Sequence, residues 1–169
     1  LPLQSWDMET QHELAFRTLQ SGLNTGKAVV RVSACGLGLE DAHVVTGGTG
    51  GLGLLTGRWL AQRGVHRLVL ASRGGALAKS TPAEWEAVQA SGAVPSVERC
   101  DTSETAHVRR LVGIDPFLSG VWHAAGVLAD AVLPKQDARG LACVCAPKAH
   151  GAWRLHSTTR STGADAVVL

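Results

Sequence analysis

The sequence has 169 residues, of which 45% are hydrophobic and 18% are charged, and its formal net charge is +2. These values are typical of one globular domain and argue against binding to nucleic acid or to an acidic membrane surface. No apolar run is long enough to span a bilayer, and the acidic N-terminal residues do not resemble a signal peptide, so we expect a cytoplasmic protein.

The four cysteines, Cys35, Cys100, Cys143 and Cys145, form no CxxC pair, and the histidines are scattered along the chain. This distribution favours reduced, mostly buried thiols over disulfides, and we expect no metal site. The sequence starts at Leu1 rather than at Met and ends within an apolar run, so we expect it to be a piece of a longer chain.

Residues 1–32 are predicted to form a first unit. Apolar residues at helical spacing predict an amphipathic helix over residues 9–20, and the Ser/Gly/Asn-rich residues 21–26 predict a turn. A strand is predicted at Lys27–Val32, and the stretch 33–41, which contains two glycines, is interpreted as a linker.

From residue 42 onward, predicted strands and helices alternate. Helices are expected over 51–63, 82–90 (with Thr81 as N-cap and Pro82 at the first position), 103–112 and 138–159. Pro147 is expected either to kink the last of these or to start a second helix. Mostly apolar strands separated by helices predict an α/β fold with a doubly wound, Rossmann-like parallel sheet, cut off after the start of its fifth strand. The predicted strands are His43–Thr46, Arg67–Ala71, Val94–Glu98, Gly120–His123 and one that begins at Asp165.

A cluster of five glycines directly follows the first strand of this sheet, and a helical pattern begins at once. Such a turn presents bare backbone N–H groups and a helix N-terminus, which together favour a phosphate. The spacing fits both GxxGxxG and TGxxxGxG, although an ordinary glycine-rich turn is an alternative. The residues expected to bind a cofactor here are Thr46, Gly47, Thr49, Gly50, Gly51, Leu52 and Gly53.

The second strand ends in Ser72 and Arg73, where a site for NAD would carry an acidic residue. A guanidinium and a hydroxyl suit a 2′-phosphate, so NADP(H) is favoured, with a solvated surface arginine as the alternative. Asp101 follows the third strand, where its carboxylate could accept a hydrogen bond from the adenine amine. Alternatively, or in addition, Asp101 belongs to the N-cap region of the next helix, and the sequence favours the two roles about equally.

The fourth strand ends in His123, Ala124, Ala125 and Gly126. All four are expected to contribute to the cofactor site, because the small residues would let the backbone lie close to the cofactor. His123 is expected to be a packed histidine with satisfied hydrogen bonds, and no acid–base role is assigned to it.

These motifs, with Ala146–His156, follow each other in the order and spacing of one family. Residues 42–169 resemble the ketoreductase domain of modular polyketide synthases and animal-type fatty acid synthases, which is a short-chain dehydrogenase/reductase. The stretch Glu13–Val30 resembles the C-terminal end of an enoyl reductase domain, which directly precedes the ketoreductase in fully reducing synthases. The resemblance therefore implies an enoyl reductase tail at 1–32, a linker at 33–41 and the N-terminal, NADPH-binding part of a ketoreductase at 42–169.

The resemblance implies that the glycine loop holds the pyrophosphate, that Arg73 with Ser72 holds the 2′-phosphate, and that Asp101 binds the adenine. Lys148 is implied to be the catalytic lysine, which binds the nicotinamide ribose and lowers the pKa of a catalytic tyrosine. That tyrosine would protonate the β-keto oxygen while NADPH delivers hydride. The sequence contains no tyrosine, so we expect these 169 residues alone not to reduce a ketone at a family-like rate.

Asp130 matches the second aspartate of a Leu-Asp-Asp element that marks B-type alcohol products in the family, and a solvated loop aspartate is the alternative. The implied partners are an acyl carrier protein with a phosphopantetheine-bound β-ketoacyl chain, the neighbouring enoyl reductase and other synthase domains. Two other functions are weighed: a free-standing short-chain reductase of a small ketone, and a non-catalytic reductase-like structural module.

Overall fold

The computed structural model describes residues 3–8, 10–31, 42–78, 81–160, 162, 164 and 166–168. It divides the chain into two compact units, Leu1–Gly36 and Leu37–Leu169. This boundary falls within the stretch 33–41, but the predicted linker itself lies outside the described residues. Among the described residues, no helix has both the length and the apolar character needed to cross a membrane.

The first unit is a small β-α-β element. Strand β1 (Leu3–Asp7) pairs in parallel with β2 (Lys27–Arg31), and α1 (His12–Gln20) connects them. The helix starts three residues later than predicted because the Asp7 carboxylate accepts hydrogen bonds from the amide and hydroxyl of Thr10 and holds the chain in a turn. Strand β1 was not predicted.

The second unit is built on a five-stranded parallel sheet with the strand order β5-β4-β3-β6-β7. The chain begins in the middle of the sheet, proceeds outward on one side, and then crosses to the other side of β3. This order confirms the predicted doubly wound fold, and it puts the topological switch point between β3 and β6. The strands are β3 (Ala42–Thr46), β4 (Arg67–Ser72), β5 (Val94–Arg99), β6 (Leu118–His123) and β7 (Ala166–Val168).

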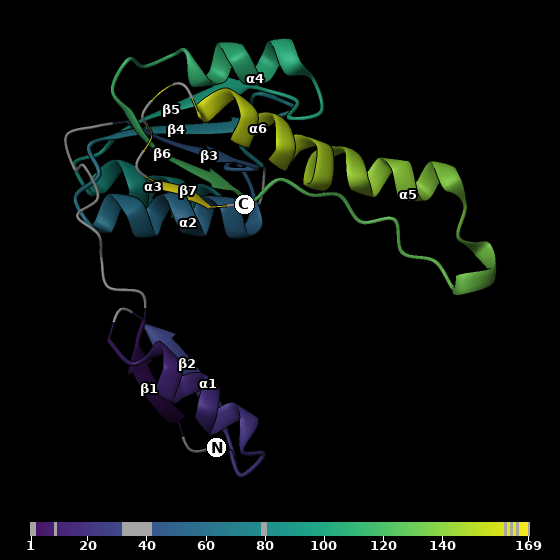
Figure 1. Cartoon of the computed structure of the whole chain (residues 1–169). Helices are drawn as coiled ribbons and strands as arrows, with labels where there is room; N and C mark the ends of the chain where they lie inside the picture. Colours follow the sequence, from purple (N-terminus) through teal and green to yellow (C-terminus); the bar gives the residue numbers. More distant parts are fainter. Residues whose placement is uncertain are drawn as a thin grey trace. The chain divides into compact units, whose positions relative to one another are not determined.

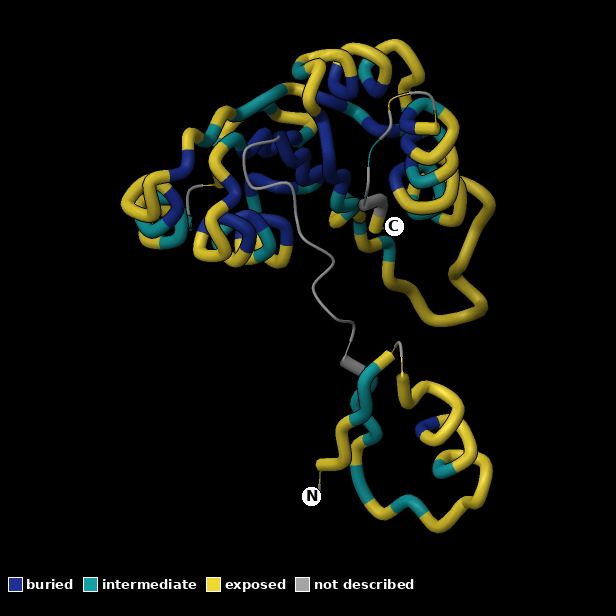
Figure 2. Tube along the Cα trace, turned by 60° about the vertical axis from the view of Figure 1, so that its left-hand side comes forward, coloured by how far each residue is buried: buried dark blue, intermediate teal, exposed yellow. Residues whose placement is uncertain are grey.

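Helices cover both faces of this sheet. Helices α2 (Gly51–Gln62) and α3 (Pro82–Ala90) lie on one face, and α4 (Thr105–Val112) and α6 (Gly151–Thr159) lie on the other (Figure 1). The apolar run of β3 serves both faces: Val44 packs with Leu111 and Leu155, whereas Val45 packs with Leu54. Figure 2 shows the buried residues concentrated in the sheet and in the helix faces toward it.

The predicted helical region 138–159 is continuous but contains a π turn. It comprises α5 (Ala138–Cys145), the π turn η2 (Ala146–His150) and α6. Pro147 lies in η2, where its missing N–H is accommodated by the wider turn, so it interrupts the helical run without starting a separate helix. None of the described residues of α5 is buried, and this helix extends beyond the sheet (Figure 1).

Thr81 is the N-cap residue of α3, and Pro82 is its first residue, as predicted. The Thr81 hydroxyl donates to the carbonyl of Ala78, however, and does not accept from a helical N–H. One local prediction needs correction. The cysteines were predicted to be mostly buried; Cys100 is buried, whereas Cys143 is exposed and Cys145 is half-buried. Cys35 lies outside the described residues.

Candidate functional site

The glycine loop between β3 and α2 is tightly packed. Gly47 has a φ of +70°, and a Cβ there would lie 2.7 Å from the carbonyl oxygen of Ala124. A Cβ on Gly53 would lie 2.1 Å from the carbonyl oxygen of Gly47. The loop therefore needs glycine at both positions, so that the start of α2 can approach the end of β3.

The N-terminus of α2 is open. Among the described residues, no neighbouring atom lies within 4 Å of where a Cβ on the N-cap Gly50 would be, and no side chain caps the helix. The first hydrogen bond of the α-helical pattern runs from the amide of Leu54 to the carbonyl of Gly50. The N–H groups of Gly51, Leu52 and Gly53 precede it and have no acceptor within the helix, which is the arrangement that favours an anion.

A cleft of 740 Å³ lies at the carboxyl ends of the strands, over this helix N-terminus. Loops after β3, β4, β5 and β6 contribute to it, together with η2. Its lining is formed by Gly47, Thr49, Gly50, Gly51, Leu52, Gly53, Ser72, Arg73, Gly74, Ala76, Ala78, Cys100, Thr102, Ala124, Ala125, Gly126, Val127, Leu128, Pro147 and Lys148.

The end of β4 brings a free cation to the cleft. Arg73 is exposed and makes no hydrogen bond or ion pair with any described residue. The Ser72 hydroxyl accepts a hydrogen bond from the amide of Gly75, which closes the turn after the strand. A guanidinium that makes no hydrogen bond or ion pair with the described residues, at the rim of a cleft, is available to an anionic ligand.

Asp101 is held by its own turn. One carboxylate oxygen accepts hydrogen bonds from the amide of Ser103 at 2.9 Å and from its hydroxyl at 2.7 Å. Partial burial raises the pKa of this carboxyl, but the Ser103 hydrogen bonds and the charges of Arg73 and His107 outweigh it and leave the pKa below its ordinary value. Asp101 is not in the lining of the cleft, although its neighbours Cys100 and Thr102 are.

Thr46 and His123 are also absent from the lining of the cleft. The Thr46 side chain is buried, and its hydroxyl oxygen lies 2.6 Å from Nδ1 of His123. Nε2 of His123 lies 2.9 Å from the carbonyl oxygen of Pro147. Both ring nitrogens are thus hydrogen-bonded, as expected for a packed histidine.

Lys148 reaches the cleft from η2. A Cβ on Gly126 would lie 3.1 Å from Cε and 3.5 Å from Nζ of Lys148, so the lysine side chain passes directly over this glycine. The Lys148 ammonium group makes no hydrogen bond or ion pair with the described residues, whereas the backbone carbonyl of Lys148 accepts from the amide of Gly151. Asp130 is exposed in the extended segment after β6 and does not line the cleft.

Sequence reasoning missed three cleft residues with distinct chemistry: Cys100, Thr102 and Pro147. Burial raises the pKa of the Cys100 thiol to about 11, so it is protonated and a poor nucleophile at neutral pH. Their positions in the sequence could have indicated them: Cys100 and Thr102 flank Asp101 at a strand end, and Pro147 precedes Lys148. No group of three or more metal-binding side chains is found among the described residues.

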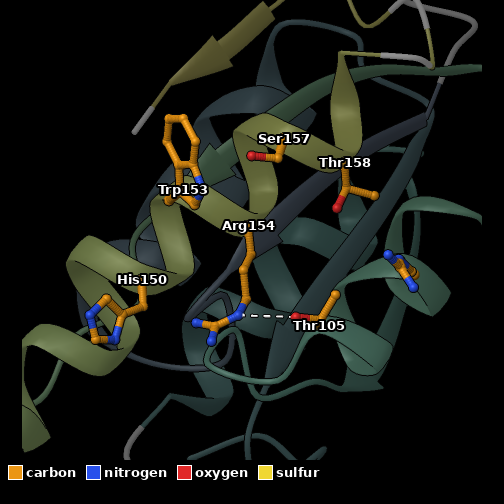
Figure 3. Close-up of a pocket in the computed structure, with 7 residues that line it drawn as sticks. Thr105, His150, Trp153, Arg154, Ser157 and Thr158 are labelled. Carbon is orange, nitrogen blue, oxygen red and sulfur yellow. Dashed lines mark hydrogen bonds between the residues drawn. The ribbon is translucent and has the colours of Figure 1, made fainter.

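A second cleft, of 720 Å³, lies between α4 and the helical run 146–159 (Figure 3). Nε of Arg154 donates to the Thr105 hydroxyl at 3.2 Å, while Nη1 of Arg154 is buried without a hydrogen-bond partner among the described residues. This groove lies between helices and has no glycine loop or strand end. The cleft at the switch point is therefore the candidate functional site.

The matches of this chain to known proteins all point to one family. A sequence model described as the KR domain matches residues 41–169. Erythronolide synthase EryA2 of Saccharopolyspora erythraea is 34% identical over 171 aligned residues, which cover 100% of this chain and 5% of the synthase. Polyketide synthase GfsB of Streptomyces halstedii is 44% identical over 134 residues, which cover 78% of this chain and 2% of GfsB.

Solved structures match in the same way. A structure of A-type ketoreductases from modular polyketide synthase superposes with a TM-score of 0.70 at 30% identity, covering 81% of this chain and 31% of the matched one. The chain thus spans a small part of its curated relatives and about a third of this ketoreductase structure.

Proposed function

Because the chain belongs to the ketoreductase (KR) domain family of modular polyketide synthases, we propose that it supplies the NADP(H)-binding half of a ketoreductase. The proposed reaction of the whole domain converts a β-ketoacyl thioester, carried by the phosphopantetheine arm of an acyl carrier protein, to the β-hydroxyacyl thioester. One observation carries the cofactor assignment: the helix N–H groups that have no acceptor within α2, and the Arg73 guanidinium, which has no hydrogen bond or ion pair with the described residues, line the same cleft.

The residues of the cleft fit a phosphorylated dinucleotide. The N–H groups of Gly51, Leu52 and Gly53 suit the pyrophosphate, and the open space at Gly50 lets it approach the backbone. Arg73 suits the 2′-phosphate of NADP(H), and none of the described residues that line the cleft has an acidic side chain that would repel it. When bound, NADPH supplies the hydride for the reduction.

Lys148 is proposed to bind the nicotinamide ribose, because its ammonium group lies over Gly126 in the same cleft. By resemblance, its charge would also lower the pKa of the tyrosine that protonates the substrate oxygen. No tyrosine occurs in the 169 residues. We therefore propose that this polypeptide binds the cofactor but does not reduce a ketone by itself.

The first unit is proposed to be the C-terminal tail of an enoyl reductase domain. The match to the KR domain begins at residue 41, whereas the alignment with EryA2 covers the whole chain, so this unit has a counterpart in a synthase. The neighbouring synthase domains and the acyl carrier protein are the proposed partners. Asp130, exposed two residues after the cleft residue Leu128, is proposed to mark a B-type alcohol product.

The proposal is tested by titrating the folded 169-residue chain with NADPH and with NADH, using nucleotide fluorescence. We expect NADPH to bind at least about tenfold more tightly, since a charge-assisted hydrogen bond contributes roughly 1.5–3 kcal/mol. No binding of either nucleotide would instead favour a non-catalytic structural module, and tighter binding of NADH would contradict the assignment of Arg73.

A second assay follows NADPH absorbance at 340 nm in the presence of a β-ketoacyl thioester of N-acetylcysteamine or of a simple cyclic ketone. We expect no consumption of NADPH by the isolated chain with either substrate. Reduction of the cyclic ketone would support a free-standing short-chain reductase.

A further inference from the structure

The π turn that carries Lys148 is tied to the sheet by side chains. The carbonyl oxygen of Pro147 lies 2.9 Å from Nε2 of His123, at the end of β6, and 3.5 Å from the hydroxyl of Thr102, just after β5. Pro147 and Lys148 are joined by one peptide bond, so a fixed Pro147 carbonyl also fixes the backbone from which the Lys148 side chain leaves.

The hydrogen bonds determine the tautomer of His123. A carbonyl oxygen can only accept, so Nε2 must carry the proton that is donated to Pro147. Burial lowers the pKa of His123 and outweighs the hydrogen bond to the Pro147 carbonyl, which raises it; the Lys148 charge lowers the pKa further, so the surroundings favour the neutral ring. Its Nδ1 then accepts from the buried Thr46 hydroxyl at 2.6 Å, and this contact anchors the ring to the end of β3.

The start of α6 packs closely against Thr102 and His123. A Cβ on Gly151, the first residue of α6, would lie 2.7 Å from Oγ1 of Thr102 and 3.5 Å from Cε1 of His123. The helix backbone therefore rests directly on these two side chains, and glycine is required for that approach. On the other side of the turn, the Lys148 side chain passes over Gly126 into the cleft.

We propose that His123, assisted by Thr102, is a positioning residue for Lys148. It holds the carbonyl of Pro147 so that the Lys148 ammonium faces the part of the cleft that takes the nicotinamide ribose. This inference rests on the proposed function. Neither side chain has to touch the reacting atoms, because both act through the backbone of η2.

The test compares two ligands of the 169-residue chain by calorimetry: NADPH, and adenosine 2′,5′-bisphosphate, which has the 2′-phosphate half but no nicotinamide ribose. In His123→Ala we expect NADPH affinity to fall about three- to tenfold, the value of one to two lost hydrogen bonds, with less than a twofold change for the bisphosphate. Lys148→Met should show the same selective loss. The double variant should bind NADPH no more weakly than Lys148→Met alone.

Two variants separate positioning from general destabilisation. His123→Gln keeps an N–H donor for the Pro147 carbonyl and should restore most of the NADPH affinity. Thr105→Val, which removes a threonine hydroxyl from the second cleft, should leave both affinities unchanged. If His123→Ala does not fold, Thr102→Val and Gly151→Ala test the same contact and should show smaller selective losses.

The possible failures are distinguishable. Three results would overturn the positioning role while NADPH binding stands. They are an equal loss of affinity for both ligands in His123→Ala, additive losses of NADPH affinity in the double variant, and an unchanged NADPH affinity in Lys148→Met. If the folded wild-type chain binds neither ligand, the proposed function itself fails, and the positioning role fails with it.

Discussion

A β-carbon on Gly53 would lie 2.1 Å from the carbonyl oxygen of Gly47, which is far inside van der Waals contact. Gly53 belongs to the first turn of α2, and Gly47 directly follows β3. This approach brings the helix N-terminus over the strand end and forms the wall of the cleft. The glycine pattern is thus explained in part by packing within the protein and in part by space for a ligand.

Gly53→Ala should destabilise the second unit. The new methyl group would meet backbone atoms that cannot move aside as a flexible side chain can, so we expect a loss of about 1–3 kcal/mol in the free energy of unfolding. Urea denaturation followed by circular dichroism measures this change.

Gly50→Ser is the matched control, since it adds a β-carbon in the same loop, at a place where none of the described neighbouring residues has an atom within 4 Å. Gly50 has an extended φ of −148° and is the N-cap of α2, a position at which serine is favoured. Its stability should be unchanged or slightly higher. Equal destabilisation by both variants would mean that the contact with Gly47 is not the cause.

Arg73→Ala should reduce the preference for NADPH over NADH. The exposed guanidinium has no partner among the described residues, so its removal should cost little stability. We expect NADPH affinity to fall about 10- to 100-fold, the value of one charge-assisted contact to a phosphate, and NADH affinity to change less than about threefold.

Arg63→Ala controls for the loss of one positive charge, because Arg63 lies at the opposite end of α2 and stacks over Trp59 at 4.5 Å. It should leave both nucleotide affinities unaltered. A similar loss for NADPH and NADH in Arg73→Ala would indicate that Arg73 does not recognise the 2′-phosphate.

Much of the second unit could be predicted because its signals are local. The apolar run of β3 and the glycines after it mark a strand, a turn and a helix, and the structure begins α2 at Gly51 as predicted. In contrast, β1 (Leu3–Asp7) has no alternating apolar pattern, and its partner strand begins at Lys27. It was missed because its strand character depends on that pairing.

Part of the candidate site could likewise be predicted from the sequence, and part of it could not. Parallel strands end at one edge of a sheet, so the strand-end residues Ser72, Arg73, Ala124 and Ala125 could be brought together from topology alone. The contacts of Pro147 could not be predicted, because they join residues 24 and 45 positions apart through side chains on different strand ends. The distance from His123 to η2 depends on how α6 packs, which no local pattern encodes.

The cysteines should differ sharply in reactivity. Burial raises the pKa of Cys100 to about 11, so at pH 8 roughly one molecule in a thousand carries the thiolate, and only 3% of the residue is exposed. Iodoacetamide should therefore modify the exposed Cys143 first and Cys100 only after denaturation. Peptide mass spectrometry at several labelling times measures each site separately, and equal rates at the two sites would show that Cys100 is accessible in the folded chain.

Acidification should weaken the contribution of His123 to stability. The folded pKa lies below the ordinary value of 6.5, mainly because burial disfavours the charged ring, so the folded state binds this proton less readily than the unfolded state. The contribution is therefore fully present above pH 6.5 and is lost as the pH falls through the folded pKa. The slope cannot exceed about 1.4 kcal/mol per pH unit for one proton.

His123→Gln isolates this effect, because glutamine can donate to the Pro147 carbonyl and does not titrate. We expect the difference in unfolding free energy between the wild-type chain and His123→Gln to be constant between pH 7 and 8. It should then shift against the wild-type chain as the pH is lowered from 6.5 toward 5, while the other histidines contribute equally to both proteins. A difference that stays constant down to pH 5, or that shifts in favour of the wild-type chain, would show that His123 is not held neutral by its surroundings.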